Sequence, residues 1–190
     1  FSQKCQEVIL QSDGKYTAIN LYFQDESSFG LFTRNGKALT AKGIKPICPF
    51  HQIFKTIYLF GAFSPVNGEK FLLEMPGCNS DSFQIFLKEF SLQNPTEFKI
   101  IVLDNGAFHK AKALIIPGNI ALIFLPPYSP ELNPAENIWA ILKRKFTNKF
   151  PHSLEEISDF IKNAIDDLPA SRIKSVCGFE YVFADLNRTN

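Results

Sequence analysis

The chain has 190 residues, of which 45% are hydrophobic and 21% are charged, and its formal net charge at pH 7 is +1. These values fit one folded domain with a sizeable core and exclude disordered and fibrous classes. No apolar run reaches the length that a bilayer needs, no signal-peptide pattern opens the chain, and the four scattered cysteines form no CxxC pair. We therefore expect a cytoplasmic protein. Because the first residue is Phe, we also expect either a piece of a longer protein or one that lost its upstream end.

The first half of the chain predicts a meander of antiparallel strands. Residues 16–24 alternate between apolar and polar side chains, and Asp25 continues the apolar face at the end of that strand. Further strands are expected over residues 29–33, 55–63 and 69–74, with a turn at Asn35-Gly36. Apolar residues then recur at helical spacing from 81 to 90, which predicts a helix with Ser80 as its N-cap.

The second half of the chain has a different pattern. Residues 99–103 and 120–125 are continuous apolar runs, typical of parallel strands buried between helices. A short helix is expected over 111–116, and longer helices over 134–145 and 153–168. Asn133 is the expected N-cap of the first long helix, while Ser153 and Glu156 form a capping box at the second. This order of elements predicts an α/β domain with a mixed sheet covered by helices.

Three acids stand at the ends of these elements. Asp25 follows the first strand, Asp104 follows the first buried run, and Glu136 opens the helix after the second run. Sites in open α/β sheets form beyond the carboxyl ends of strands, so these acids converge if the first and fourth strands are neighbours. Converging carboxylates repel one another unless cations lie between them. We therefore expect two bound Mg²⁺ or Mn²⁺ ions, which are suited to phosphodiester chemistry.

Each acid also has an ordinary explanation. Asp104 in Asp-Asn-Gly is a common turn residue, Asp25 could simply end a strand, and Glu136 suits a capping position near a helix N-terminus. The sequence pattern leaves these alternatives open. Trp139, at helical spacing from Leu142, is expected in the core.

Basic residues gather in three acid-free or acid-poor stretches. Such stretches around isolated acids suit a phosphate-binding surface, and ordinary solvated lysines explain them equally well. The residues concerned are Arg34, Lys37, Lys42, Lys45 and Lys55, then Lys110 and Lys112, then Lys143, Arg144, Lys145 and Lys149.

Several motifs together resemble a known family. QDESSFGL (24–31), YLFGAFSP (58–65), LDNGAFHK (103–110), LPPYSPELNPAENIW (125–139) and LKRKF (142–146) follow one another along nearly the whole chain. In this order they resemble the IS630 group of the IS630/Tc1/mariner transposases.

The resemblance implies a ribonuclease-H-like fold, with a five-stranded mixed sheet and a D-D-E triad that binds two divalent ions. By motif, the triad is Asp25, Asp104 and Glu136. Glu26 faces the other side of its strand and Glu131 precedes the helix, so both are less suitable as ligands. The resemblance also supports a place near the site for His109 and Asn105. Within the basic clusters, the candidate DNA contacts are Arg34, Lys37, Lys110, Lys143, Arg144 and Lys145, with solvated surface as the alternative.

The implied activity is that of a bacterial transposase that cuts phosphodiesters at transposon ends and joins the 3′-OH to target DNA at TA, as a homodimer. We expect the catalytic domain to span residues 1–190, with its core at about 14–150 and a helical extension at about 151–190. The family's N-terminal helix-turn-helix region is expected to be absent, since too few residues precede Asp25, and separate encoding of that region is one explanation. The alternatives are another ribonuclease-H-like nuclease and an inactive copy that only binds DNA or dimerises.

Overall fold

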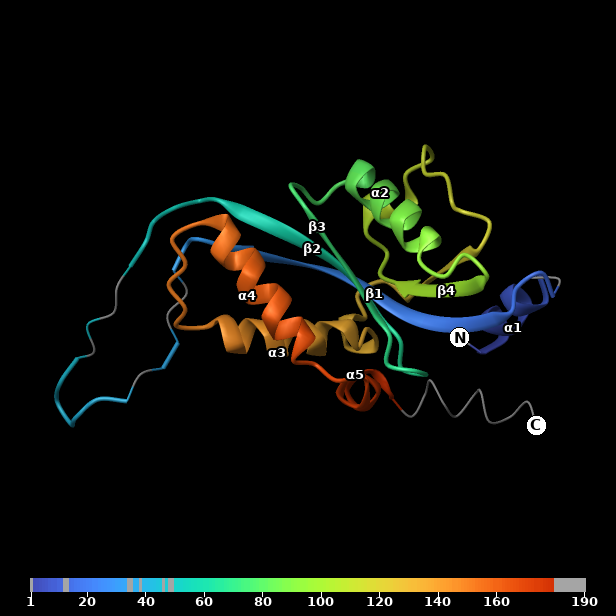
Figure 1. Cartoon of the computed structure of the whole chain (residues 1–190). Helices are drawn as coiled ribbons and strands as arrows, with labels where there is room; N and C mark the ends of the chain where they lie inside the picture. Colours follow the sequence, from blue (N-terminus) through green and yellow to red (C-terminus); the bar gives the residue numbers. More distant parts are fainter. Residues whose placement is uncertain are drawn as a thin grey trace.

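The computed structural model describes residues 2–11, 14–33, 36–37, 39–45, 47 and 50–179. Its centre is a five-stranded sheet in the order β3-β2-β1-β4-β5 (Figure 1). The strands are β1 (Ala18–Gly30), β2 (Thr56–Phe63), β3 (Lys70–Met75), β4 (Glu97–Leu103) and β5 (Ile120–Phe124). The first three strands pair antiparallel, whereas β4 runs parallel to β1 and β5 runs parallel to β4. The predicted mixed sheet is confirmed. The first and fourth strands are neighbours, which is the condition under which the acids were expected to converge.

Helices cover both faces of this sheet. Figure 1 shows α2 (Ser80–Leu92) on one face and α3 (Ala135–Phe146), α4 (Leu154–Asp166) and α5 (Ala170–Cys177) on the other. Successive side chains of β1 point to opposite faces of the sheet and so contribute to both cores. Phe23 packs in the core under α3, and Tyr22 packs in the Phe-rich core under α2. A helix that the sequence did not predict, α1 (Ser2–Gln11), contacts β5. Within the described residues, no helix is long and apolar enough to cross a membrane.

The strand β1 is longer than predicted. Its pairing with β2 continues to Gly30, which lies opposite Thr56, and this pairing keeps the backbone extended past the end of β4. The prediction of a separate strand at 29–33 was therefore wrong, and Asp25 lies inside a strand rather than at its end. In the predicted turn that follows, Asn35 lies outside the described residues.

The predicted helix at 111–116 is absent, and the short 3₁₀ helix η1 (Ala107–Lys110) precedes this segment instead. A side chain of α2 explains the difference. Gln84 accepts a hydrogen bond from the Ile115 amide at 2.7 Å and donates one to the Ile115 carbonyl at 2.9 Å. These contacts occupy the two backbone groups that Ile115 would use in a helix.

The helix caps follow the predictions only in part. Asn79, rather than Ser80, caps α2, and its side chain accepts a hydrogen bond from the Ser82 amide at 2.9 Å. Ser153 caps α4 as predicted, accepting from the Glu156 amide at 3.2 Å. The Glu156 carboxylate, however, accepts from the backbone of His152 rather than from Ser153. The helix ends at Asp166, short of the predicted end, and α5 follows.

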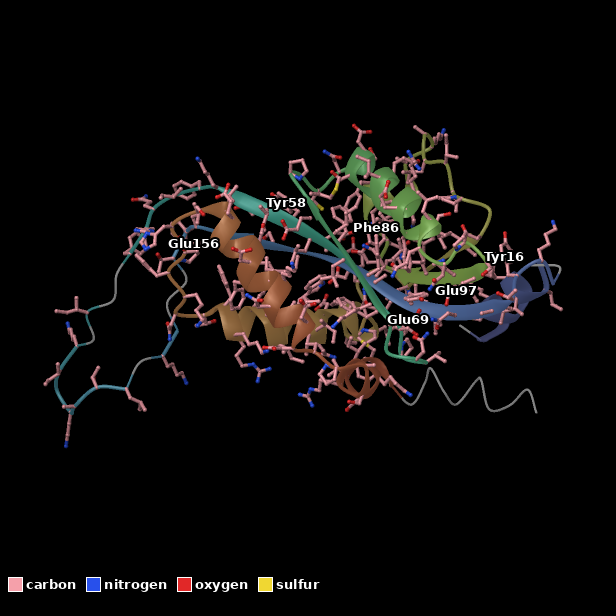
Figure 2. The ribbon with its side chains drawn as sticks, viewed as in Figure 1. Tyr16, Tyr58, Glu69, Phe86, Glu97 and Glu156 are labelled. Atoms are coloured by element: carbon pink, nitrogen blue, oxygen red, sulfur yellow. The ribbon has the colours of Figure 1, made fainter. Side chains whose placement is uncertain are left out.

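A buried polar cluster holds the strands together on the side of the sheet where the parallel strands begin. The Tyr22 hydroxyl lies 2.7 Å from Glu69 Oε2 and 3.1 Å from Glu97 Oε2. Figure 2 shows Glu69 and Glu97 in this region. Lys99 Nζ lies 3.5 Å from Glu97 and completes the cluster. Burial, reinforced by the two carboxylates, raises the pKa of the Tyr22 phenol, so its proton remains in place.

A glycine sets the distance between α3 and the sheet. Gly61 of β2 lies opposite Asp25 of β1, and the indole of Trp139 packs directly on it. A Cβ atom at position 61 would lie 2.7 Å from the Trp139 ring. Trp139 is only 3% exposed, so it belongs to the core as predicted.

We predict that Gly61→Ala destabilises the protein by about 1–3 kcal/mol, because the buried indole must move away from the added methyl group. Chemical denaturation measures the loss. Gly77→Ala is the matched control, since a Cβ there meets nothing closer than 3.5 Å. Equal stability of the two variants would show that α3 tolerates a shift from the sheet.

Candidate active site

The three predicted acids line one cavity at the edge of the sheet. The β1–β4 register pairs Phe23 with Val102, so Asp25 lies level with Asp104, which follows β4 directly. Glu136 is in the first turn of α3. The cavity has a volume of about 430 Å³, and besides the acids it is lined by Asn105, Gly106, Leu125, Pro126, Pro127, Tyr128, Ser129, Pro130 and Asn133.

Asn133 fixes the start of α3 above β1. Its Nδ2 donates to the Gln24 carbonyl at 2.9 Å, next to Asp25, and its Oδ1 accepts from the Ala135 amide at 3.2 Å. The helix starts at Ala135, and Pro134 already has helical backbone angles. The N-cap position is Pro134, one residue after the predicted Asn133, and it makes no capping hydrogen bond through its side chain. The Asn133 side chain instead satisfies the Ala135 amide and ties the first turn to the sheet.

The capping explanation of Glu136 does not fit this geometry. A capping box would join its carboxylate to the Asn133 amide, but that amide donates to the Pro130 carbonyl at 2.8 Å. The exposed Glu136 carboxylate makes no hydrogen bond or ion pair with the described part of the chain. The carboxylate is therefore free to bind a ligand in the cavity.

His109 bridges two acids from different strands, namely Glu26 within β1 and Asp104 directly after β4. Its Nδ1 lies 2.8 Å from Asp104 Oδ1, and its Nε2 lies 3.0 Å from Glu26 Oε1. The imidazole is 1% exposed and packs against Phe83 and Phe108. Burial alone would lower its pKa, but the hydrogen bonds to Asp104 and Glu26 outweigh burial and raise the pKa to about 9. At neutral pH both ring nitrogens carry protons and donate to the carboxylates.

The acids respond differently to this environment. The hydrogen bond from His109 lowers the pKa of Asp104. By contrast, burial and then the charge of Glu26 raise the pKa of Asp25 to about 7, with smaller contributions from Glu136 and Asp104. The site therefore keeps Asp104 ionised and lets Asp25 hold a proton near neutral pH, until a cation favours its charged form.

The carboxylates of the cavity are suited to hard divalent cations that keep part of their water shell. Among the described residues, no group of three His, Cys, Asp or Glu side chains is close enough to hold one ion. Mg²⁺ commonly keeps several waters and takes only one or two protein carboxylates. Three acids that line one cavity, one of them with a raised pKa, meet that requirement.

Asn105 joins the two loops beside the acids. Its Nδ2 donates to the Leu125 carbonyl, and its Oδ1 accepts from Lys110 Nζ. Leu125, in turn, donates its amide to the Leu103 carbonyl at 2.9 Å. The exits of β4 and β5 are thereby held together at the floor of the cavity.

The predicted basic residues do not all gather at this site. Lys110 and Lys4 line an adjoining hollow that shares Asn105 and Pro126–Pro127 with the acid-lined cavity. Lys143, Arg144 and Lys145 are exposed in the last turn of α3, and Lys145 pairs with Asp167 at 3.6 Å. Lys37 is exposed in the β1–β2 connection, and Arg34 lies outside the described residues.

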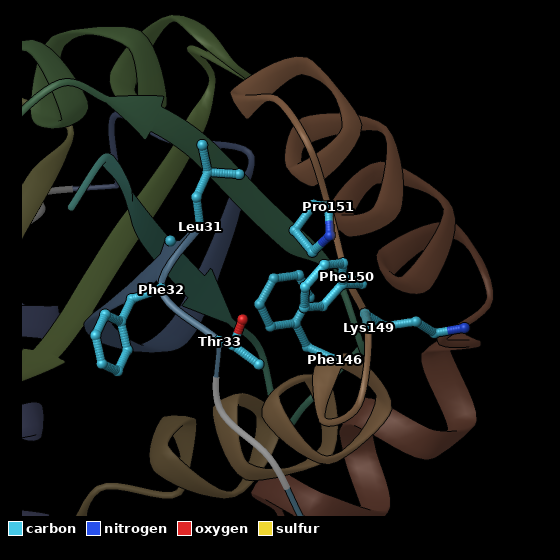
Figure 3. Close-up of a pocket in the computed structure, with 8 residues that line it drawn as sticks. Leu31, Phe32, Thr33, Phe146, Lys149, Phe150 and Pro151 are labelled. Carbon is cyan, nitrogen blue, oxygen red and sulfur yellow. The ribbon is translucent and has the colours of Figure 1, made fainter. Parts of the chain in front are cut away.

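A second hollow, between residues 30–33 and 146–151, is too small for a substrate. Figure 3 shows Phe32, Phe146 and Phe150 around it. Its volume of about 10 Å³ holds at most one water molecule. It is a packing gap.

Sequence reasoning missed three features of the site. Glu26 does face away from Asp25, as predicted, but it holds His109, which is 83 positions away in the chain. The tie from Asn133 to Gln24 and the exposed Tyr128 were also missed. The adjacency of Glu26 to Asp25 was visible in the sequence, whereas nothing local linked it to His109.

Comparisons with solved structures support the fold. A solved structure of the Mos1 mariner paired-end complex with Mn superposes with a TM-score of 0.68 at 15% identity, covering 93% of this chain and 57% of that one. A pre-cleavage Mos1 transpososome gives a TM-score of 0.66 at 14% identity, with the same coverage. This likeness and the sheet order define a ribonuclease-H-like fold.

The sequence comparisons give the family. The family model described as "DDE superfamily endonuclease" matches residues 20–158, so the chain belongs to that family. An uncharacterized protein of Sinorhizobium fredii (strain NBRC 101917 / NGR234), y4pE/y4sA, is 38% identical over 87 residues. That match covers 45% of this chain and 64% of the relative.

We predict that Asp25→Asn stabilises the metal-free protein at pH 8 by on the order of 2 kcal/mol. The pKa of Asp25 is raised to about 7 in the folded state, so the folded protein holds this proton more tightly than the unfolded chain does. The resulting contribution of Asp25 to stability is complete below its unfolded pKa and is lost as the pH rises toward 7. The gain should therefore shrink as the pH falls to about 4. Urea unfolding across this range measures it, with exposed Asp159→Asn as the control. A gain that does not depend on pH would contradict the assigned cause.

We predict that His109→Ala destabilises the protein by about 2–4 kcal/mol at pH 6, because Glu26, whose side chain is 11% exposed, loses its partner. The effect should fade as the pH rises through about 9, where His109 loses its proton. In a Glu26→Gln background the loss should be smaller. A double-mutant cycle tests this coupling, and additive effects of the two changes would show that the bridge contributes nothing.

Proposed function

We propose that this chain is the catalytic domain of a DNA transposase of the IS630 group. It cuts phosphodiesters at the ends of a transposable element and joins the freed 3′-OH to target DNA. The carrying observation is that Asp25, Asp104 and Glu136, from three distant segments, line one cavity in a chain of the DDE superfamily endonuclease family.

Asp25, Asp104 and Glu136 would hold two Mg²⁺ or Mn²⁺ ions. When bound, such ions lower the pKa of an attacking water or 3′-OH and stabilise the departing oxygen. The donor set supports this assignment, because all three groups are hard oxygen ligands and Asp25 gains from a neighbouring cation. Mos1 paired-end complexes have been solved with Mn and with Mg, which is consistent with the same choice here.

The chain's own residues prepare the acids for this task. His109 orients Asp104 and keeps it ionised, while Asn133 holds the first turn of α3 over β1 and so presents Glu136 to the cavity. Asp25 stands between them on the rigid central strand. Acids held on strands and on an anchored helix turn need little reorganisation when substrate binds.

The partners proposed are DNA and a second copy of the chain. Exposed Lys37, Lys143 and Arg144, with Lys110 beside the cavity, are suited to phosphate contacts, and Arg34 and Lys145 complete the proposed set. The Mos1 structures include a paired-end complex with a transposon end, which supports a homodimer acting on two ends. A separately encoded helix-turn-helix half would recognise terminal repeats in the bacterial cytoplasm.

The proposed domain comprises residues 1–190, with a core at about 14–150 and a helical extension at about 151–190. In the described part of the extension, α4 and α5 pack into the same core as α3. They therefore stabilise the layer that carries Glu136.

We predict that the protein, with a DNA-binding half supplied, nicks supercoiled plasmid carrying the element's ends in Mg²⁺ or Mn²⁺ and stops when EDTA is added. Asp104→Asn and Glu136→Gln should each reduce nicking by at least about 100-fold, because each removes a metal-binding carboxylate. The readouts are plasmid nicking and the rise in melting temperature with Mn²⁺.

Glu131→Gln is the control, because Glu131 is exposed on η2 (Pro130–Leu132) and does not line the cavity. A folded wild-type protein without nicking would favour an inactive DNA-binding copy. Cleavage of RNA–DNA hybrids without terminal repeats would favour another nuclease of the same fold.

A further inference from the structure

Tyr128 is a fully exposed aromatic side chain at the rim of the acid-lined cavity. Its exposure is 101%, whereas most other aromatic side chains in the described structure are packed in the two cores. It lies in the loop between β5 and α3 and lines the same cavity as Asp25, Asp104 and Glu136. No ring contact of Tyr128 is recorded within the described residues.

The backbone of Tyr128 is strained in a way that keeps the ring outside. Its φ is 58°, a left-handed value that costs a non-glycine residue about 1–2 kcal/mol. Asn or Gly would adopt this conformation more easily. The Tyr128 ring therefore contributes nothing to the core, and a tyrosine at this position costs backbone strain that Asn or Gly would avoid. An exposed ring kept at such a cost points to a role in binding.

The surrounding loop holds this conformation in place. Pro127 precedes Tyr128 and Pro130 follows two positions later, which restricts the backbone on both sides. The Asn133 amide donates to the Pro130 carbonyl at 2.8 Å, and the Asn133 side chain is anchored on β1. Tyr128 thus projects from a rigid support fixed to the same strand as Asp25.

An exposed flat ring beside a phosphodiester site suits a nucleobase. A phosphodiester that reaches the three acids brings its two nucleosides to the rim of the cavity. Stacking of a base on an aromatic side chain is independent of sequence, and it is strongest for bases that are not paired in a duplex. Lys110 and Lys4 in the adjoining hollow are placed to accompany the backbone of such a strand.

We propose that the Tyr128 ring stacks on an unpaired nucleobase next to the phosphodiester being cut. The inference rests on the proposed function for the identity of the substrate. The stacking itself needs neither metal nor cleavage, so it can be tested separately.

The test measures binding of a single-stranded oligonucleotide of about 12 nucleotides, with one 2-aminopurine, in low salt and EDTA. Stacking on an aromatic ring changes 2-aminopurine fluorescence. Wild type, Tyr128→Phe and Tyr128→Trp should bind similarly and give this change. Tyr128→Asn should bind about 5- to 100-fold more weakly and lose it.

The Asn variant separates binding from folding. Because Asn accepts left-handed backbone angles, its melting temperature should equal or exceed that of the wild type. Leu92→Asn, which removes a 62%-exposed apolar side chain from α2, is the control and should bind like the wild type. The inference would be overturned if the wild type and Tyr128→Asn bound the oligonucleotide equally and gave the same fluorescence. It would also be overturned if the wild type caused no change in 2-aminopurine fluorescence, or if Tyr128→Phe lost binding. Failure of the proposed function would instead appear as absent nicking in the plasmid assay.

Discussion

The parallel pairing of β1 with β4 is the constraint on which the site depends. It brings Asp25 level with Asp104, although the two acids lie in different halves of the chain. Because β4 ends at Leu103 while β1 continues along β2, the acids stand where the sheet narrows and a cavity can open. Asn133 and His109 then orient groups around a frame that the strand pairing has already set.

The electrostatics of this frame support the proposed cation. His109 donates one ring proton to Glu26 and the other to Asp104, so its positive charge is paired with these two acids rather than with Asp25. Asp25 is left among like charges, and its raised pKa reflects burial and that repulsion. The burial of Asp25 among like charges lowers the stability of the fold, a cost that active sites commonly carry.

The proline-rich loop before α3 serves both the inside and the outside of the site. On the inside, Asn133 fastens the loop to β1 and sets the height of Glu136 above the sheet. On the outside, the same loop holds Tyr128 in a strained conformation toward solvent. Restricting the backbone with prolines makes both placements possible, because a flexible loop would relax the strain and loosen the helix start.

The sequence by itself determined the elements whose patterns are local. Alternation in β1, continuous apolar runs in β4 and β5, and the capping residue Ser153 were readable because each depends on near neighbours in the chain. Only the tertiary structure decided the length of β1, the loss of the helix at 111–116 and the Glu26–His109–Asp104 bridge. Each of these depends on a partner far away in sequence, namely β2, Gln84 or a second acid, and no local pattern encodes which distant group will arrive.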